Sequence, residues 1–244
     1  MHDAGVKQLD FLFRNSAHAK SISLNISDSL IPVVLWYHAP MMDNVEKVLV
    51  VKADWIHTLH TKRGFIRDVH PDFLPGLSEQ AFFLDRPVAE ADPGFRQVIP
   101  YTLVRSDGRY LTVTRHKTQG EARLHDKMSF GIGGHINPVD TEKADFLNAG
   151  LKRELSEELR VDDPPGFSDL ELMGLICDDT DEVSQVHLGV VLRWTVENRI
   201  EVRETDKMSG NYLTPAEIGD VHERLENWSR LVYNGLLDTK VESK

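Results

Sequence analysis

Short runs of apolar, β-branched and aromatic residues, separated by turn signals, dominate the chain from residue 97 onward. Gln97–Val104 and Arg109–Thr114 are two such runs, and the segment between them ends in an Asp-Gly pair that is typical of a tight hairpin turn. Leu170–Cys177 and Val186–Thr195 predict two further strands, with the acidic segment Asp178–Glu182 between them. We therefore expect a sheet that contains one hairpin and two later strands.

Two segments predict helices. The first runs from about Lys143 to Leu159 and stops before a segment with two adjacent prolines, and the second runs from Pro215 to about Leu237. Strands, helix, strands and helix in this order favour an α+β fold in which helices cover a mixed sheet. Four leucines recur at i+4 spacing in the first helix and should seat it on the sheet: Leu147, Leu151, Leu155 and Leu159.

The part before residue 95 has a weaker pattern. Residues 1–41 are interpreted either as an extension of uncertain order or as an ordinary segment with an extra strand at Val33–Tyr37. Lys47–Ile56 predicts a strand that runs into a short helix or turn. Residues 70–95 contain four prolines and should be mostly loop, with a short strand at Ala81–Leu84.

We accordingly predict three parts: an N-terminal extension (1–41), a strand and loop region packed on the core (42–94), and the main domain (95–240).

Composition narrows the class of protein. The 244 residues are 41% hydrophobic and carry a net charge of −11, which disfavours a broad nucleic-acid-binding surface. Cys177 is the only cysteine, so an internal disulfide is excluded and a reducing compartment is favoured. The apolar run Leu30–Tyr37 is much shorter than the ~20 residues of a membrane span. The first eleven residues resemble no secretory signal, so we expect a cytoplasmic protein without membrane contact.

Three glutamates in the first predicted helix provide the candidate chemistry. With about 100° per residue, Glu154, Glu157 and Glu158 lie within roughly a third of the helix circumference. Crowded like charges destabilise a helix unless a cation lies among them, and hard oxygen ligands suit Mg²⁺ or Mn²⁺. The alternative is a solvated acidic face with no ligand.

A glycine cluster precedes this helix. Gly131, Gly133 and Gly134 lack Cβ atoms, so backbone can approach a ligand closely there, and backbone carbonyls can bind metal.

These two features together resemble the Nudix hydrolase signature, G-x5-E-x7-R-E-U-x-E-E-x-G-U, in which U is aliphatic. The match covers a glycine at Gly133-Gly134 and then Arg153, Glu154, Leu155, Glu157, Glu158 and Val161. The surrounding chain, from roughly Val48 onward, is similar to MutT-type predicted phosphoesterases in segments 95–101, 121–125 and 131–137. The resemblance implies a Nudix-type α/β/α sandwich.

The chain departs from the signature at two places. Gly134 and Arg153 are 153 − 134 = 19 positions apart, where the signature has 14, so five residues are inserted. Counting back from Arg153, the signature's early glutamate falls on Asp145, with Glu142 as the other candidate. Arg160 replaces the late glycine and should change how the helix ends.

The resemblance implies a hydrolase that attacks a diphosphate linkage with a metal-activated water. Glu154, Glu157 and Glu158 are then ligands of Mg²⁺ or Mn²⁺, with the Gly133 carbonyl as a further ligand, and Arg153 orients the carboxylates.

The general base is Glu154 or a carboxylate of Asp178–Glu182. The expected substrate is a small-molecule phosphoanhydride, such as a nucleoside diphosphate linked to another group. A homodimer is compatible with these features. Four residues are candidates for substrate binding: Arg115, Lys117, Arg123 and His135.

Two alternatives remain. One is an isopentenyl-diphosphate isomerase, but that family has a cysteine before the helix, where this chain has Gly133. The other is a ligand-sensing module whose catalytic site has decayed. The inserted residues, Asp145 and Arg160 favour the second alternative, whereas the intact glutamate cluster disfavours it.

Overall fold

The computed structural model describes residues 45–115, 127–142, 145–203, 205 and 208–237. The chain divides into two units, Met1–Met42 and Asp43–Lys244, and every described residue belongs to the second. The predicted extension, including Val33–Tyr37, lies outside the described residues. The division at residue 94 stays a prediction. Within the described residues, no helix is long and apolar enough to cross a membrane.

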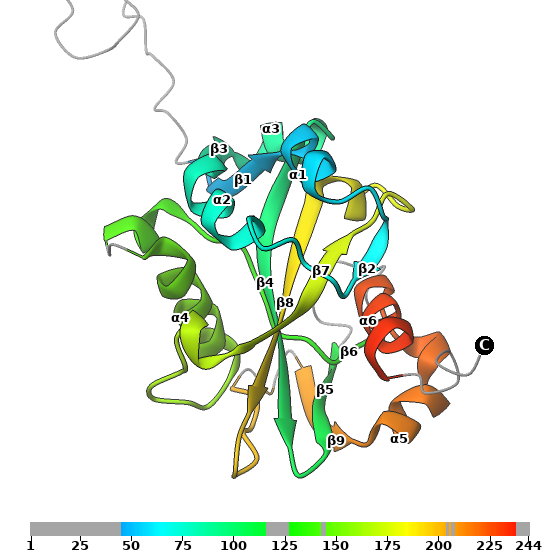
Figure 1. Ribbon diagram of the computed structural model, residues 1–244. Helices are drawn as coiled ribbons and strands as arrows, with labels where there is room; N and C mark the ends of the chain where they lie inside the picture. Colours follow the sequence, from blue (N-terminus) through cyan, green and yellow to red (C-terminus); the bar gives the residue numbers. More distant parts are fainter. Residues whose placement is uncertain (1–44, 116–126, 143–144, 204, 206–207, 238–244) are drawn as a thin grey trace, which may run out of the picture. The chain divides into compact units, whose positions relative to one another are not determined.

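A mixed sheet forms the centre of the described part (Figure 1). Six of its strands follow the order β2-β7-β8-β4-β1-β3, and β5, β6 and β9 extend the sheet beside β4. β4 and β8 are parallel, whereas the other pairs are antiparallel. The strands are β1 (Lys47–Lys52), β2 (Gly64–Ile66), β3 (Phe82–Asp85), β4 (Phe95–Ser106), β5 (Arg109–Arg115), β6 (Met128–Ser129), β7 (Glu171–Cys177), β8 (His187–Thr195) and β9 (Met208–Leu213).

Helices lie on opposite sides of this sheet, with α4 on one side and α5 and α6 on the other (Figure 1). This arrangement confirms the α+β fold with a mixed sheet between helical layers. The α-helices are α1 (Ala53–Leu59), α2 (Phe73–Gln80), α3 (Arg86–Ala91), α4 (Phe146–Glu158), α5 (Pro215–Asp220) and α6 (Asn227–Val232). Short turns are η2 (Pro138–Glu142), η3 (Phe167–Asp169), η4 (Ser184–Val186), η5 (His222–Arg224) and the wider η6 (Tyr233–Leu237).

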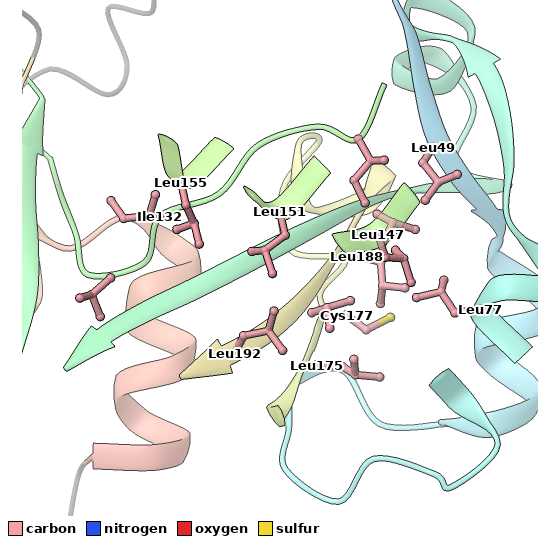
Figure 2. Packing of buried hydrophobic residues seen from close by; sticks show 14 of the residues in the cluster. Leu49, Leu77, Ile132, Leu147, Leu151, Leu155, Leu175, Cys177, Leu188 and Leu192 are labelled. Atoms are coloured by element: carbon pink, nitrogen blue, oxygen red, sulfur yellow. The ribbon is translucent and has the colours of Figure 1, made fainter. Parts of the chain in front are cut away.

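The leucine stripe packs as predicted. Leu147, Leu151, Leu155 and Leu159 expose 9% of their surface or less. Figure 2 shows Leu147, Leu151 and Leu155 of α4 pointing toward the strands, where Leu188 and Leu192 of β8 lie. Burying such side chains stabilises the fold by ~1.5–3 kcal/mol each. The same packing fixes the adjacent face of α4, which carries the glutamates.

The predicted hairpin is confirmed. β4 pairs with β5 in antiparallel register through Arg105↔Tyr110 and Ser106↔Arg109. Asp107 and Gly108 at the tip have φ of 47° and 74°. Positive φ at both central residues is the geometry that an Asp-Gly turn adopts most readily. The four predicted strands are all present, and none of their ends is displaced by more than two residues.

Two predictions were wrong. Residues 70–95 are not mostly loop, because they contain α2 and α3 as well as β3. Pro75 and Pro87 lie in the first turns of these helices, where a backbone N–H has no helical partner to lose.

The tail is also not one helix: the chain is extended at Leu225 and Glu226, between η5 and α6. Leu225 forms a bridge with Met128, and the Glu226 amide donates to the Met128 carbonyl at 2.9 Å. Pairing with the strand segment therefore replaces the helical bonds at this point.

Candidate active site

α4 presents its glutamates to different degrees. The Glu154 side chain is 15% exposed, whereas that of Glu157 is 58% exposed. Glu158 is partly buried. The helix therefore places one carboxylate in a sheltered position and another in solvent.

Arg153 is the centre of the hydrogen bonds at this site. Its Nη1 donates to Glu154 Oε1 at 2.7 Å and, at a longer 3.4 Å, to Glu157 Oε1. Its Nη2 donates to the His135 carbonyl at 2.8 Å and to Asn137 Oδ1 at 3.1 Å. The guanidinium thus joins the carboxylates of α4 to the segment that follows the glycine cluster. A role of Arg153 in orienting metal ligands stays a prediction.

Asp140 completes this network, and sequence reasoning missed it. Arg153 Nε donates to Asp140 Oδ1 at 3.1 Å and Nη2 donates to Oδ2 at 3.2 Å. The Asn137 amide donates to Oδ2 at 2.9 Å, and Asp140 is only 5% exposed. Counting forward from Gly134 by the signature's spacing reaches 134 + 6 = 140, so the five inserted residues follow Asp140.

Asp145, the position favoured by counting back from Arg153, does not contact Arg153 in any hydrogen bond of the described residues and has a structural role in α4. It is the N-cap of α4 and accepts a hydrogen bond from the Asn148 amide at 3.0 Å. Counting back fails because the insertion lies between Asp140 and Arg153. The Glu142 side chain lies outside the described part of the structure.

Each glycine of the cluster lies where a side chain would collide with a neighbour. A Cβ at Gly131 would lie 2.1 Å from the Tyr101 ring, and one at Gly133 would lie 2.0 Å from the Pro100 carbonyl oxygen. A Cβ at Gly134 would lie 2.1 Å from Glu154 Oε2. The first two glycines therefore permit packing on β4, and Gly134 permits close approach of backbone to the sheltered carboxylate.

Two opposing effects act on the pKa of Glu154. Burial raises the pKa of its carboxyl, Arg153 acts in the opposite direction, and the net pKa lies above the ordinary 4.5. A buried carboxylate that is costly to ionise becomes easier to ionise beside a further cation.

His135 and His187 meet beside the glycine cluster. Their Nε2 atoms are 3.4 Å apart, and His187 Nδ1 lies 2.7 Å from the Val183 carbonyl oxygen. Burial, with Arg86 as a second cause, lowers the pKa of His135 to about 4. Burial also lowers the pKa of His187. Both rings are therefore neutral near pH 7.

The end of α4 differs from the signature as expected from Arg160. Leu159 has φ −115° and ψ 152°, and it forms a bridge with Val202. The Arg160 amide donates to the Glu201 carbonyl at 2.8 Å, and the Arg203 amide donates to the Glu158 carbonyl at 2.7 Å. A short β-type contact thus ends the helix where the signature has a glycine.

The acidic loop after Cys177 is tied into the structure by its own carboxylates. Asp178 Oδ2 and Asp181 Oδ2 each accept a hydrogen bond from Asn227 at 2.9 Å. Asp179 pairs with Arg96 and Arg63. Glu182 is exposed. A general base in this loop stays a prediction.

The other candidate residues are placed only in part. Arg115 ends β5, and Lys117 and Arg123 lie outside the described residues. Across the described ranges, no group of three or more His, Cys, Asp or Glu residues is arranged to hold a metal ion. The carboxylates of α4 therefore do not form a closed cage by themselves.

Comparison with known proteins identifies the family. The solved structure of Tm1382, a candidate Nudix hydrolase, has a TM-score of 0.67 and 32% identity, and the match covers 79% of this chain and 99% of Tm1382. Protein YmaB of Bacillus subtilis (strain 168) is 35% identical over 150 residues, which are 59% of this chain and 72% of YmaB.

A more distant match is the MutT protein from Methanosarcina mazei Go1, with 19% identity, a TM-score of 0.40, and coverage of 60% of this chain and 95% of that protein. No family model matches the chain. The identity to Tm1382 over nearly the whole of that protein agrees with the signature residues on α4. The chain therefore belongs to the Nudix hydrolase superfamily, whose enzymes act on phosphoanhydride bonds.

Proposed function

We propose that this Nudix hydrolase depends on Mg²⁺ and cleaves the diphosphate of a nucleoside diphosphate linked to another group. The observation that carries the proposal is the position of Arg153. One guanidinium holds Asp140, Glu154 and the His135 carbonyl together, and Gly134 packs directly against the Glu154 carboxylate. Such an arrangement fixes an anionic group beside accessible backbone, where a cation and a phosphate can both bind.

The residues present fit a hard divalent cation. Glu154, Glu157 and Glu158 offer carboxylate oxygens, and the Gly133 carbonyl is a further oxygen ligand. Mg²⁺ commonly takes few protein ligands and completes its shell with water and substrate phosphates. A small number of protein ligands is consistent with the described residues, in which no group of three or more His, Cys, Asp or Glu is arranged to hold a metal ion. Mn²⁺, which accepts the same ligands, is expected to replace Mg²⁺.

When bound, the cation neutralises the anionic oxygens of the diphosphate and lowers the pKa of a water molecule. The chain's own residues hold the geometry. Arg153 fixes Glu154 in one orientation, and Asp140 holds Arg153. We propose Glu154 or a carboxylate of Asp178–Glu182 as the general base. Arg115, Lys117, Arg123 and His135 are proposed to contact the substrate.

The surroundings of Cys177 favour a hydrolase over a cysteine-dependent isomerase. Cys177 is fully buried in the core between α4 and the sheet, and burial raises the pKa of its thiol. A buried neutral thiol is a poor proton donor to a substrate that binds at the surface. A cytoplasmic location and a homodimer stay predictions.

Cleavage of a panel of nucleoside diphosphate sugars and dinucleoside polyphosphates into their two phosphorylated fragments, separated by chromatography and followed with and without Mg²⁺, tests the proposal. We expect turnover of at least one compound, only with the cation present. Glu157→Gln and Glu158→Gln should each reduce turnover by several orders of magnitude while the fold survives. Glu223→Gln, at a side chain 93% exposed on η5, is the matched control and should retain wild-type turnover.

Calorimetry with Mg²⁺ should show uptake that both active-site variants weaken. Wild-type turnover in both variants would remove these glutamates from the chemistry. Tight binding of one compound without turnover of any would instead support the ligand-sensing module.

A further inference from the structure

Two imidazole rings lie together beside the candidate active site. His135 directly follows Gly134, whose backbone packs against Glu154, and His187 begins β8. Their ring centroids are 5.5 Å apart, and the closest ring nitrogens are the two Nε2 atoms at 3.4 Å. Neither imidazole takes part in the hydrogen bonds of Arg153, so the network described above gives this pair no role.

The orientation of the His187 ring is fixed by three contacts. Its Nδ1 is 2.7 Å from the Val183 carbonyl oxygen, and its Nε2 faces His135. The ring also stands edge-on to Trp228, at a centroid distance of 6.2 Å and an interplanar angle of 80°. A carbonyl oxygen can only accept a hydrogen bond, so the proton of a neutral His187 lies on Nδ1.

The proton on His187 determines where the proton on His135 lies. A neutral imidazole carries one N–H, so His187 Nε2 is an acceptor. The contact between the two Nε2 atoms is favourable only if His135 Nε2 carries a proton and donates it. The Nδ1 of His135 then has a lone pair and no proton. Among the described residues, no group donates to this atom, and the His135 side chain is partly exposed.

We propose that His187 is a positioning residue that holds His135 as the Nε2–H tautomer, so that His135 Nδ1 accepts a hydrogen bond from a hydroxyl or amino group of the substrate. The inference rests on the proposed function, because it takes the substrate to bind beside Glu154. The phosphate oxygens of a nucleoside diphosphate linked to another group carry no proton at neutral pH and only accept hydrogen bonds, so a lone pair at Nδ1 does not attract them. His135 therefore selects for the part of the substrate that is not phosphate.

Nitrogen-15 spectra of the histidine-labelled full chain at neutral pH, without metal or nucleotide, test the tautomers directly. We expect His135 protonated on Nε2 and His187 on Nδ1. His187→Gln keeps an acceptor toward His135 and should preserve the Nε2–H form, whereas His187→Ala should give a mixture of tautomers. His222→Ala, a histidine whose Nε2 contacts Asn234, is the control. A wild-type His135 protonated on Nδ1 would overturn the proposal, and this result needs no variant.

The substrate contact is tested with two probes in the presence of Mg²⁺. ADP-glucose carries hydroxyl and amino donors, whereas inorganic tripolyphosphate, fully ionised as its Mg²⁺ complex at mildly alkaline pH, carries none. Binding of ADP-glucose should shift the Nδ1 resonance of His135, and tripolyphosphate should not. In kinetics with ADP-glucose, His187→Ala should raise KM about tenfold, more than it lowers kcat, and His187→Gln should restore KM.

Equal shifts with both probes, or an unchanged KM in His187→Ala, would refute the contact. Failure of the proposed function appears differently, as no turnover of any compound of the nucleotide panel by the wild-type protein with Mg²⁺, and it leaves the tautomer spectra readable.

Discussion

Asp140 holds Arg153 through both of its carboxylate oxygens, although the two residues are 13 positions apart in the chain. The Asp140 side chain is 4% exposed and that of Arg153 is 26% exposed. Burial acts to lower the pKa of Arg153, but hydrogen bonds to Asp140 and Glu154 raise it above its ordinary value. Arg153 thus stays cationic, and its orientation depends on a residue that is outside the glutamate cluster.

Asp140→Asn should therefore impair both activity and stability. A partner that orients a ligand is worth about 10–100-fold in activity. We expect the free energy of unfolding to fall by about 2 kcal/mol, which is less than the ~3–5 kcal/mol of a fully buried pair because Arg153 keeps some solvent contact. Turnover with Mg²⁺ and urea unfolding measure the two effects.

The matched control is Asp145→Asn. Asparagine caps a helix as well as aspartate does, so stability should change by less than about 0.5 kcal/mol and turnover should be unaffected. If Asp145→Asn lost activity and Asp140→Asn kept it, the role assigned to Asp140 would be wrong.

The difference between these two aspartates shows what the sequence can and cannot predict. The strands, the hairpin and the leucine stripe follow from local patterns, because one face of each element must be buried. Helical periodicity predicts that the glutamates of α4 share one face. The role of Asp140 cannot be predicted in this way, because counting from either end of the signature is equally valid until the position of the insertion is known. The break in the tail at Leu225 depends on pairing with Met128, which is distant in the sequence.

Gly134→Ala and Gly133→Ala should have different effects. Gly134 is expected to be needed for activity, and Gly133 is expected to be needed for stability. At Gly134 the new Cβ would meet the flexible end of Glu154, whose carboxylate can move away. We expect a stability loss of about 1 kcal/mol but a large loss of turnover and of Mg²⁺ affinity. At Gly133 the Cβ would meet the backbone of Pro100, so β4 itself must shift, and a stability loss of about 3 kcal/mol is expected. Calorimetry and thermal unfolding of both variants check this contrast. Similar stability losses in the two would contradict it.

Asp179 should make stability depend on pH in the acidic range. Burial acts to raise the pKa of its carboxyl, but hydrogen bonds from Arg96 and Arg63 dominate, and the net pKa lies below the ordinary 3.8. A lowered pKa in the folded state gives stability that is present above the unfolded pKa and is lost as pH falls through the folded pKa.

Asp179→Asn should accordingly destabilise the protein by about 1 kcal/mol near pH 7, a small value because the carboxylate is partly exposed and screened by solvent. The difference from wild type should stay constant down to about pH 5 and shrink below about pH 4. Urea unfolding across this range measures it. A difference that grew on acidification would mean that the ion pair with Arg96 is not its source.

Tyr101 should control how firmly α6 is held on the sheet. Its buried hydroxyl lies 2.8 Å from Ser229 Oγ of α6 and 3.0 Å from Ser129 Oγ, and its ring stands edge-on to Trp228. Tyr101→Phe keeps the ring but leaves buried hydroxyls short of a partner, at a cost of about 1–2 kcal/mol.

Because the lost bond joins α6 to β4, backbone amides of α6 should exchange with solvent faster, while those of β4 and β8 keep their protection. Tyr212→Phe, which loses hydrogen bonds to Ile200 elsewhere in the fold, should not have this local effect. Hydrogen exchange followed by mass spectrometry resolves the segments. Equal acceleration of exchange across the whole sheet in both variants would contradict this prediction. The hydroxyl of Tyr101 would then contribute to global stability and not specifically to the packing of α6 on β4. The position of Trp228 beside His187 would not depend on it.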